Sequence, residues 1–281
     1  MLIIETIDAI QEHLGRCRDQ GKTIALVPTM GGLHQGHLQL IDKAKSHADV
    51  VVASIFVNPT QFAPLEDLSN YPHRPEADKK GLMGRGTDVL FLPSVEQIYP
   101  KNQISGYEVG EIALLLCGKS RPTHFKGVAQ VVSRLFDIVE PDVAVFGEKD
   151  YQQLQIIKQL IERQKRKITI ATIGIVREDD GLAMSTRNKY LNTKERVLAP
   201  NFNQALRQAK SDYLGGMALN DVISRAKDSL GKPFELDYFE MLDANTLTQI
   251  TTSSTDVIVI SAVKLGLNRL IDNIVFRRLN V

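Results

Sequence analysis

Residues 24–37 read IALVPTMGGLHQGH, and this stretch decides the fold. Its apolar start, Ile24–Val27, predicts a buried β-strand, and the apolar positions after it predict a helix over Leu38–Ala48. A glycine turn lies between the two. A strand, a glycine turn and a helix start together present unpaired backbone N–H groups and the positive end of a helix dipole, which suit a phosphate group. The sequence therefore predicts chemistry on a nucleoside triphosphate at this turn.

Two histidines, His34 and His37, lie in the turn at a spacing that puts both imidazoles on one side of a helix. Gly36 between them leaves room for a ligand against the backbone. An isolated H-x-x-H pair is more often surface decoration or an N-terminal cap. A zinc site would need further ligands, and Cys17 and Cys117 are far apart and lack a pairing motif. The preceding strand and the glycines are what favour a role on phosphate.

The composition excludes several classes of protein. Of the 281 residues 43% are apolar and 24% charged, which is ordinary for a soluble globular protein. A net charge of +1 gives no reason to expect nucleic acid or a membrane surface as the main partner. The longest apolar stretch, Val50–Val57, is too short to span a bilayer, and two cysteines fit a reducing compartment. We therefore expect a cytoplasmic protein that binds small molecules.

Short β-branched runs alternate with helical patterns up to residue 176. Strands that are apolar on both faces and separated by helices predict a doubly wound parallel sheet, a Rossmann-like α/β domain over residues 1–176. The predicted strands are Ile24–Val27, Val50–Val57, Val89–Leu92, Val143–Phe146 and Ile168–Val176, and the predicted helices are Leu38–Ala48, Val128–Val139 and Tyr151–Arg163.

The pattern changes after residue 176. Helical segments there precede three strand-like runs, with glycines and a proline as breakers between them. This order predicts a smaller α+β domain over residues 177–281. Its predicted helices are Lys194–Tyr213 and Leu219–Leu230, and its predicted strands are Leu236–Leu242, Val257–Val263 and Arg269–Phe276.

Two further motifs follow the predicted ends of other strands. FVNPTQF (56–62) contains Gln61, whose amide suits a small ligand that carries hydroxyls and a carboxylate. FGEKDYQQL (146–154) contains Lys149, a point cation suited to phosphate oxygens, and Gln153 lies one turn into the helix that follows. Because ligands bind beyond the carboxyl ends of parallel strands, we expect Gln61 and Gln153 to face one cavity.

Polar side chains continue on both sides of the predicted domain boundary. Asp150 either accepts from ribose hydroxyls or caps the next helix, and the residues alone leave both open. The segment REDDGLAMSTRN (177–188) carries Ser185, Thr186 and Arg187, whose hydroxyl and guanidinium donors match a polyphosphate. A glycine-containing loop of this kind could close over ATP, whereas a turn with helix-capping Ser and Thr explains the same residues.

Taken together, five segments resemble the pantothenate synthetase (pantoate–β-alanine ligase) family, and the H-x-G-H signature among them is similar to that of the nucleotidyltransferase superfamily. A joint match of this extent is specific, whereas a lone H-x-G-H is not. The matching segments are PTMGGLHQGH (28–37), FVNPTQF (56–62), SRPTHFKGV (120–128), FGEKDYQQL (146–154) and REDDGLAMSTRN (177–188).

The resemblance implies a reaction in two steps. The carboxylate of pantoate attacks the α-phosphate of ATP, which gives pantoyl adenylate and pyrophosphate. The amine of β-alanine then attacks this mixed anhydride and releases pantothenate and AMP. The resemblance also implies Mg²⁺ carried by ATP, and a homodimer formed through the larger domain.

The resemblance assigns roles residue by residue. His34, His37 and Lys149 form the catalytic set, with His37 as the proton donor. Arg121 and His124 are second-rank candidates for polar contacts. Gln61, Gln153 and Met30 are assigned to pantoate, and Gln61 also to β-alanine. The residues assigned to ATP are Met30, Gly31, Gly32, Leu33, His34, Gln35, Gly36, His37, Gly147, Glu148, Lys149, Asp150, Val176, Met184, Ser185, Thr186 and Arg187.

Some positions depart from the family pattern. Arg74 stands one place later than the arginine that the family usually has there, and the acidic stretch behind it, 76–78, leaves the protein ligand of Mg²⁺ open. Asp78 is the candidate, with most of the coordination expected from ATP phosphates and water. The other departures are Thr60, Thr123 and Gln130.

Two other classes of protein are weighed against this interpretation. Another H-x-G-H nucleotidyltransferase would act on a small phosphorylated acceptor, but Gln61 and Gln153 are neutral where such an acceptor calls for Arg or Lys. A non-catalytic nucleotide-binding module would be marked by loss of His34, His37 or Lys149, and all three are present.

Overall fold

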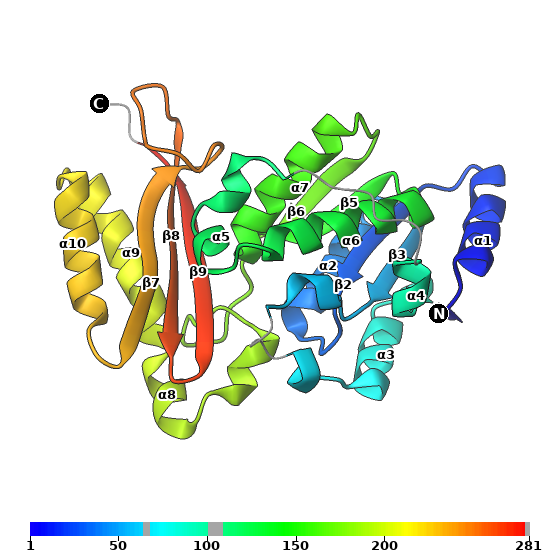
Figure 1. The fold of residues 1–281 in the computed structure, drawn as a ribbon, viewed down its shortest axis with the longest axis horizontal. Helices are drawn as coiled ribbons and strands as arrows, with labels where there is room; N and C mark the ends of the chain where they lie inside the picture. The colour runs from blue at the N-terminus through cyan, green and yellow to red at the C-terminus, as the bar shows by residue number, and fades with distance from the viewer. Residues whose placement is uncertain (64–67, 101–108, 279–281) are drawn as a thin grey trace. The chain divides into compact units, whose positions relative to one another are not determined.

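The computed structural model describes residues 1–63, 68–100 and 109–278. The chain forms two compact units (Figure 1). The first comprises Met1–Glu148 and Gln153–Gly174, and the second comprises Lys149–Gln152 and Ile175–Val281. The two compact units separate between Gly174 and Ile175. The predicted domain boundary between residues 176 and 177 stays a prediction.

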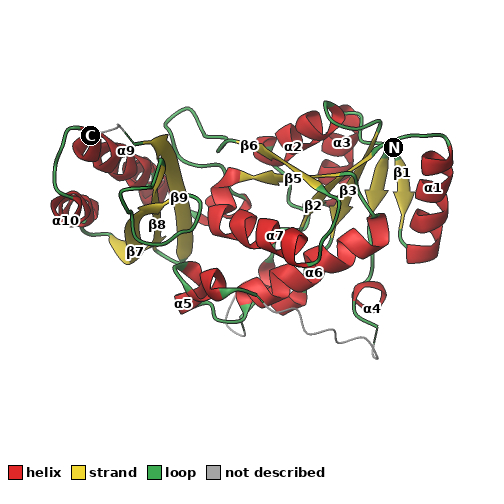
Figure 2. Cartoon of the chain, turned by 90° about the horizontal axis from the view of Figure 1, so that it is seen from above, coloured by secondary structure: helices red, strands yellow, loops and turns green. Residues whose placement is uncertain are grey.

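The described part of the first unit contains a six-stranded parallel sheet in the order β1-β4-β3-β2-β5-β6. Helices cover both of its faces, as Figure 2 shows from above. This arrangement confirms the predicted doubly wound α/β domain. The strands are β1 (Leu2–Ile4), β2 (Ile24–Thr29), β3 (Val50–Ile55), β4 (Val89–Phe91), β5 (Val143–Gly147) and β6 (Thr169–Ile173).

Burial of β2 on both faces explains its unbroken apolar sequence. Successive side chains of a strand point to opposite faces, so Ile24 and Leu26 pack with one set of helices and Ala25 and Val27 with the other. All four are fully buried. One set contains α1 (Ile7–Asp19), α6 (His124–Val139) and α7 (Tyr151–Arg163), and the other contains α2 (Gln35–Lys45) and α3 (Pro75–Gly84).

The order of the strands locates the crevice of this sheet. From β2 the chain moves outward through β3 to β4, and it then returns to place β5 and β6 on the other side of β2. The direction of winding therefore reverses between β2 and β5. In open parallel sheets, ligands bind beyond the carboxyl ends of the strands at such a reversal. Two short helices, α4 (Val95–Ile98) and α5 (Cys117–Ser120), complete the described α-helices of this unit.

The second unit contains, within its described residues, an antiparallel sheet in the order β7-β8-β9, with α9 and α10 packed against it (Figure 1). Its core joins Phe202 of α9 and Val222 of α10 to Phe239 and Val259 of the sheet. The predicted α+β class is confirmed. The strands are β7 (Phe234–Asp243), β8 (Asp256–Leu265) and β9 (Asn268–Arg277), and the helices are α8 (Thr193–Leu198), α9 (Pro200–Leu214) and α10 (Leu219–Leu230).

Several element boundaries differ from the predicted ones. The helix predicted over Lys194–Tyr213 is divided into α8 and α9 at Pro200, because proline lacks an N–H donor and suits the first position of a helix. The strand predicted over Ile168–Val176 ends at Ile173. The elements β1, α1 and α3 are not predicted from the sequence. β1 has only three residues, and α1 buries only Ile10, Leu14 and Cys17, so the apolar pattern of each is weak. No helix among the described residues is long and apolar enough to cross a membrane.

Candidate active site

The turn between β2 and α2 requires glycine. Gly31 and Gly32 have φ angles of 83° and 62°, a backbone region that strains residues with a side chain. A Cβ atom on Gly31 would also lie 3.0 Å from Cγ2 of Ile55 and 3.1 Å from Oδ2 of Asp78. The turn therefore packs tightly against the end of β3 and against α3.

Asp78 of α3 stabilises this turn by accepting hydrogen bonds from its backbone. Its Oδ2 accepts from the N–H of Gly32 and its Oδ1 from the N–H of Leu33, both at 2.8 Å, and the residue is 3% exposed. The N–H of Gly31 donates to Oγ1 of Thr29. The expectation of unpaired N–H groups at this turn is therefore wrong for Gly31, Gly32 and Leu33. The assignment of these three residues to ATP stays a prediction. Their backbone N–H groups do not favour it, because all three already donate to side chains of the protein.

The same contacts bear on the proposed ligand of Mg²⁺. Both carboxylate oxygens of Asp78 already accept hydrogen bonds from the backbone, and the side chain lies under the turn. Among the residues that the structure describes, no group of three or more His, Cys, Asp or Glu side chains could hold a metal ion. The role of Asp78 on Mg²⁺ stays a prediction, and its geometry is that of a structural carboxylate.

The two histidines are oriented by the backbone of the first turn of α2. Nδ1 of His34 accepts from the N–H of Gly36, and Nδ1 of His37 accepts from the N–H of His34. Because a backbone N–H donates, each Nδ1 is unprotonated in these contacts, and Nε2 carries the proton of each neutral ring. The ring centroids are 4.1 Å apart. The pair thus caps the helix, and it also holds two N–H donors in a defined orientation that suits phosphate oxygens.

The side chain of Asn58, which follows β3, forms hydrogen bonds with four neighbouring residues. It is 1% exposed, and its Nδ2 donates to Oε1 of Gln61 at 3.2 Å and to the carbonyl of Gly127 at 3.1 Å. Its Oδ1 accepts from the hydroxyls of Tyr99 and Thr60. The sequence motif contains Asn58 but marks it only as the end of a strand before a proline. The structure shows that it orients the side chain of Gln61.

Gln61 and Met30, two of the residues predicted to bind pantoate, lie in contact with each other. Its Nε2 lies 3.0 Å from Sδ of Met30, which follows β2. The backbone carbonyl of Gln61 lies 2.9 Å from Nδ1 of His124 and accepts from Nη2 of Arg121 at 3.4 Å. A Cβ on Gly127 would overlap the backbone carbonyl of Thr60, so glycine at this position allows α6 to approach this segment.

Gln153 lies on α7 in the first unit and is half-buried. Its convergence with Gln61 on one ligand stays a prediction. Glu148, which follows β5, accepts from the hydroxyl of Thr172 on β6 at 2.7 Å, so its carboxylate is directed along the sheet edge. Lys149 and Asp150 follow it in a single 3-10 turn that leads into α7.

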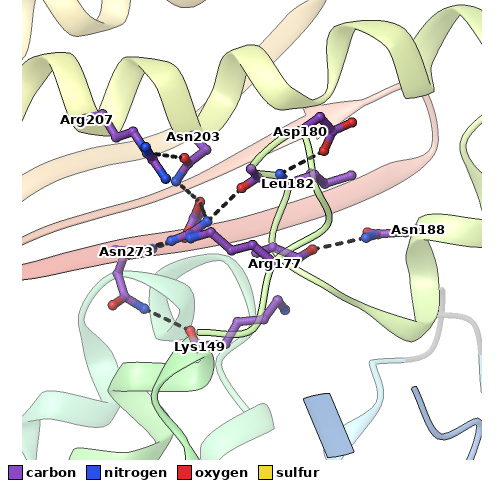
Figure 3. Close-up of polar contacts among 11 residues, drawn as sticks. Lys149, Arg177, Asp180, Leu182, Asn188, Asn203, Arg207 and Asn273 are labelled. Atoms are coloured by element: carbon purple, nitrogen blue, oxygen red, sulfur yellow. Dashed lines mark hydrogen bonds and ion pairs between the residues drawn. The ribbon is translucent and has the colours of Figure 1, made fainter. Parts of the chain in front are cut away.

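Residues 177–188 form a hairpin followed by a turn in the second unit (Figure 3). Arg177 pairs with Ala183 as an antiparallel bridge, and the N–H of Met184 donates to the carbonyl of Val176. Asn188 donates from Nδ2 to the carbonyl of Ala183. The turn with a capping serine, the alternative left open by the residues, is present, because Oγ of Ser185 accepts from the N–H of Arg187.

An ion pair braces the tip of this hairpin. Asp180 pairs with Arg196 of α8, and its Oδ1 accepts from the N–H of Leu182. The Arg196 hydrogen bond holds the pKa of the Asp180 carboxyl below its usual value, against the opposing effect of partial burial. The pair is therefore ionised at neutral pH. Binding of ATP by Met184, Ser185, Thr186 and Arg187 stays a prediction.

A doubly wound parallel sheet with paired histidines beyond its central strand has the fold of a nucleotide-binding α/β enzyme. A sequence model of the family described as pantoate–β-alanine ligase matches residues 2–275. The chain is 51% identical over 259 residues to the pantothenate synthetase of Ruthia magnifica subsp. Calyptogena magnifica, covering 92% of this chain and 93% of the relative. The chain belongs to the pantoate–β-alanine ligase family, and its activity is the ligation of pantoate with β-alanine.

Solved structures agree with this assignment. The fold matches the crystal structure of pantothenate synthetase from Thermus thermophilus with a TM-score of 0.92 at 37% identity, covering 98% of this chain and 99% of that one. It matches the pantoate–β-alanine ligase from Francisella tularensis, complexed with β,γ ATP and β-alanine, with a TM-score of 0.82 at 36% identity, covering 98% and 97%. The alternative of another H-x-G-H nucleotidyltransferase is therefore not favoured.

The buried carboxylate under the turn yields a test. Asp78→Asn keeps the shape of the side chain but replaces one acceptor with an NH₂ group, which leaves one turn amide unpaired. A buried unpaired donor costs about 1–3 kcal/mol, so we expect the free energy of unfolding, measured with denaturant, to fall by that amount. Glu76→Gln is the control, because Glu76 lies on the same helix with its side chain 85% exposed in a surface ion pair. Unchanged stability together with a raised Mg²⁺ requirement would contradict the structural role and support the metal role.

Proposed function

We propose that the ligation runs through pantoyl adenylate. The pantoate carboxylate attacks the α-phosphate of ATP, and pyrophosphate leaves. The β-alanine amine then attacks the acyl carbon, and AMP leaves with the electron pair of the broken C–O bond. Adenylation is chemically useful because AMP is a far better leaving group from an acyl carbon than oxide or hydroxide.

One observation carries this proposal: His34 and His37 are fixed by their Nδ1 contacts with the backbone, at the end of the central strand β2. Donors held in place before the reaction stabilise developing phosphate charge without having to reorganise. We propose that both rings donate from Nε2 to ATP phosphate oxygens and that His37 supplies a proton to the leaving group. Lys149 is proposed as the point cation on the same phosphates.

The neutral amides are proposed to hold the acid and the amine. Gln61, held by Asn58 and lying against Met30, supports a pocket for a ligand with hydroxyls and a carboxylate beside apolar groups. Gln153 is proposed as the second amide on pantoate, and Gln61 as the contact to β-alanine. The Francisella tularensis enzyme was crystallised with β,γ ATP and β-alanine, which supports both as ligands of this chain.

Mg²⁺ is proposed to enter with ATP. Mg²⁺ in ATP-using enzymes keeps several waters and binds mainly to phosphate oxygens, where it neutralises their charge. The two oxygens of Asp78 are engaged by backbone amides, which supports coordination by phosphate rather than by this carboxylate.

The setting of the enzyme is proposed from the family resemblance and from the cysteines. We propose a homodimer formed through the first unit, which sedimentation of the purified protein tests. The chain has two cysteines, Cys17 and Cys117, and so small a number supports a reducing compartment such as the cytoplasm.

Isotope exchange tests the adenylate scheme. With pantoate, ATP and Mg²⁺ but no β-alanine, labelled pyrophosphate should enter ATP, because the first half-reaction is reversible. His37→Ala should slow this exchange by about 10²–10³-fold, the usual loss for a donor that stabilises transition-state charge. His47→Ala is the control, since His47 is an exposed histidine just beyond the same helix. Exchange that requires β-alanine would contradict the scheme, and exchange at the wild-type rate in His37→Ala would remove His37 from it.

A second experiment tests the amide pocket. Gln153→Ala should raise the KM for pantoate and leave the Kd for ATP nearly unchanged, because a hydrogen bond to a charged ligand group is worth about 1.5–3 kcal/mol. Gln159→Ala, farther along the same helix, should change neither value. Equal weakening of ATP and pantoate binding by Gln153→Ala would show that Gln153 acts structurally.

A further inference from the structure

A buried polar cluster lies on β9 of the second unit, around Asp272 (Figure 3). Asp272 is 2% exposed and accepts from both terminal nitrogens of Arg177, at 2.8 and 2.9 Å. Its Oδ2 also accepts from Nδ2 of Asn203 on α9 at 2.9 Å. A buried charge is tolerated only when it is paired and hydrogen-bonded, and these contacts meet that requirement.

The next residue of the strand, Asn273, connects this cluster to Lys149. Its backbone N–H donates to Oδ1 of Asp272 at 2.7 Å, and its side-chain Nδ2 donates to the backbone carbonyl of Lys149 at 3.0 Å. Asn273 is 3% exposed. The two residues are 124 positions apart in the chain, so this contact joins β9 to the turn that precedes α7.

Asn273 is an unusual choice for this position if packing alone decides it. Asparagine is depleted in strands, and a buried amide costs free energy unless its polar atoms are paired. An apolar side chain would satisfy the core of the sheet without a partner. The amide does what an apolar side chain cannot: it binds the carbonyl of one particular residue and thereby restricts the backbone of Lys149.

The cluster also reaches the hairpin at 177–188. Besides its two bonds to Asp272, the Arg177 guanidinium donates to the carbonyl of Gly181 at 3.0 Å. The adjacent residues Asp272 and Asn273 thus fix, through one hydrogen-bonded group, the backbone of Lys149 and the tip of the hairpin. Both segments are assigned to ATP by the family resemblance.

We propose that Asn273 is a positioning residue for Lys149, holding its backbone so that the ammonium group meets the ATP phosphates in one orientation. The inference rests on the proposed role of Lys149. Asn273 itself does not touch substrate; it acts through the lysine. Loss of its amide lets the Lys149 side chain spread over more orientations, and ATP then binds with a larger loss of conformational entropy.

The test measures ATP affinity by calorimetry in the presence of Mg²⁺ and the absence of pantoate, so that no turnover occurs. Asn273→Ala should weaken ATP binding about five- to tenfold, the usual size of one hydrogen bond. In a Lys149→Ala background the same change should have no further effect, because residues that act through one another are not additive. The KM for pantoate should stay at the wild-type value.

Asn203→Ala is the matched control. Asn203 is also 3% exposed and also bonded within the Asp272 cluster, but its hydrogen bonds within the described part of the chain go to Asp272 and Arg207 rather than to Lys149. We expect it to lower the thermal unfolding temperature while leaving the ATP affinity unchanged. If Asn273→Ala does not fold, Asn273→Ser replaces it, because the hydroxyl is small, polar and too short to reach the carbonyl.

The outcomes separate this inference from the role of Lys149. If Lys149→Ala weakens ATP binding and Asn273→Ala does not, the positioning role is overturned and the role of the lysine stands. If Asn273→Ala weakens ATP binding equally in both backgrounds, or if Asn203→Ala matches it, the amide is merely structural. If Lys149→Ala leaves ATP affinity unchanged, the proposed role of the lysine is overturned and the positioning role with it.

Discussion

Burial of β2 on both faces is the constraint on which the site depends. Its side chains pack alternately with α1, α6 and α7 and with α2 and α3, so neither face of the strand can meet a substrate. A substrate can therefore approach the strand only at its carboxyl end, which lies next to the reversal of strand order between β2 and β5. The turn with its two histidines, the Met30 side chain and, one strand away, Gln61 are therefore placed along one edge of the sheet. Chemistry is confined to that edge by the packing of the sheet.

The turn is built differently from a simple phosphate cradle. A buried carboxylate, Asp78, accepts from two backbone amides that would otherwise be available to a phosphate. We propose that the imidazoles of His34 and His37 supply the donors to ATP instead. This arrangement suits a reaction whose charge changes during the attack on the α-phosphate. A ring can donate a hydrogen bond and also transfer a proton, whereas a backbone amide only donates. The conformation of the turn thus depends on a second element, α3, which supplies Asp78.

Much of the fold could be predicted from the sequence because local patterns determine it. Continuous apolar runs mark the central parallel strands, and the strand-like runs after residue 233 mark β7, β8 and β9. β1 has three residues, two of them exposed, so no pattern distinguishes it. The motifs likewise predict His34, His37 and Gln61 as site residues, because these residues lie in segments that follow strand ends.

The supporting residues of the site could not be predicted in this way. Asp78 meets Gly32 across 46 positions, Asn58 meets Gly127 across 69, and Asn273 meets Lys149 across 124. Each is a polar residue whose role depends on a partner that no local periodicity indicates. The sequence marks Asp78 only as a candidate metal ligand, and an asparagine before a proline looks like the end of a strand. The three-dimensional fold alone shows that these side chains contact the backbone or side chain of a predicted site residue or of its neighbour.

The central claim is that the pantoate carboxylate attacks the α-phosphate of ATP, and transfer of labelled oxygen tests it most directly. Pantoate that carries ¹⁸O in its carboxylate is turned over with ATP, Mg²⁺ and β-alanine, and the products are analysed by mass spectrometry. The account predicts one ¹⁸O atom in the phosphate of each AMP, because the bridging oxygen stays with phosphorus when the amine attacks the acyl carbon. AMP free of label, or label found in inorganic phosphate together with ADP, would contradict it.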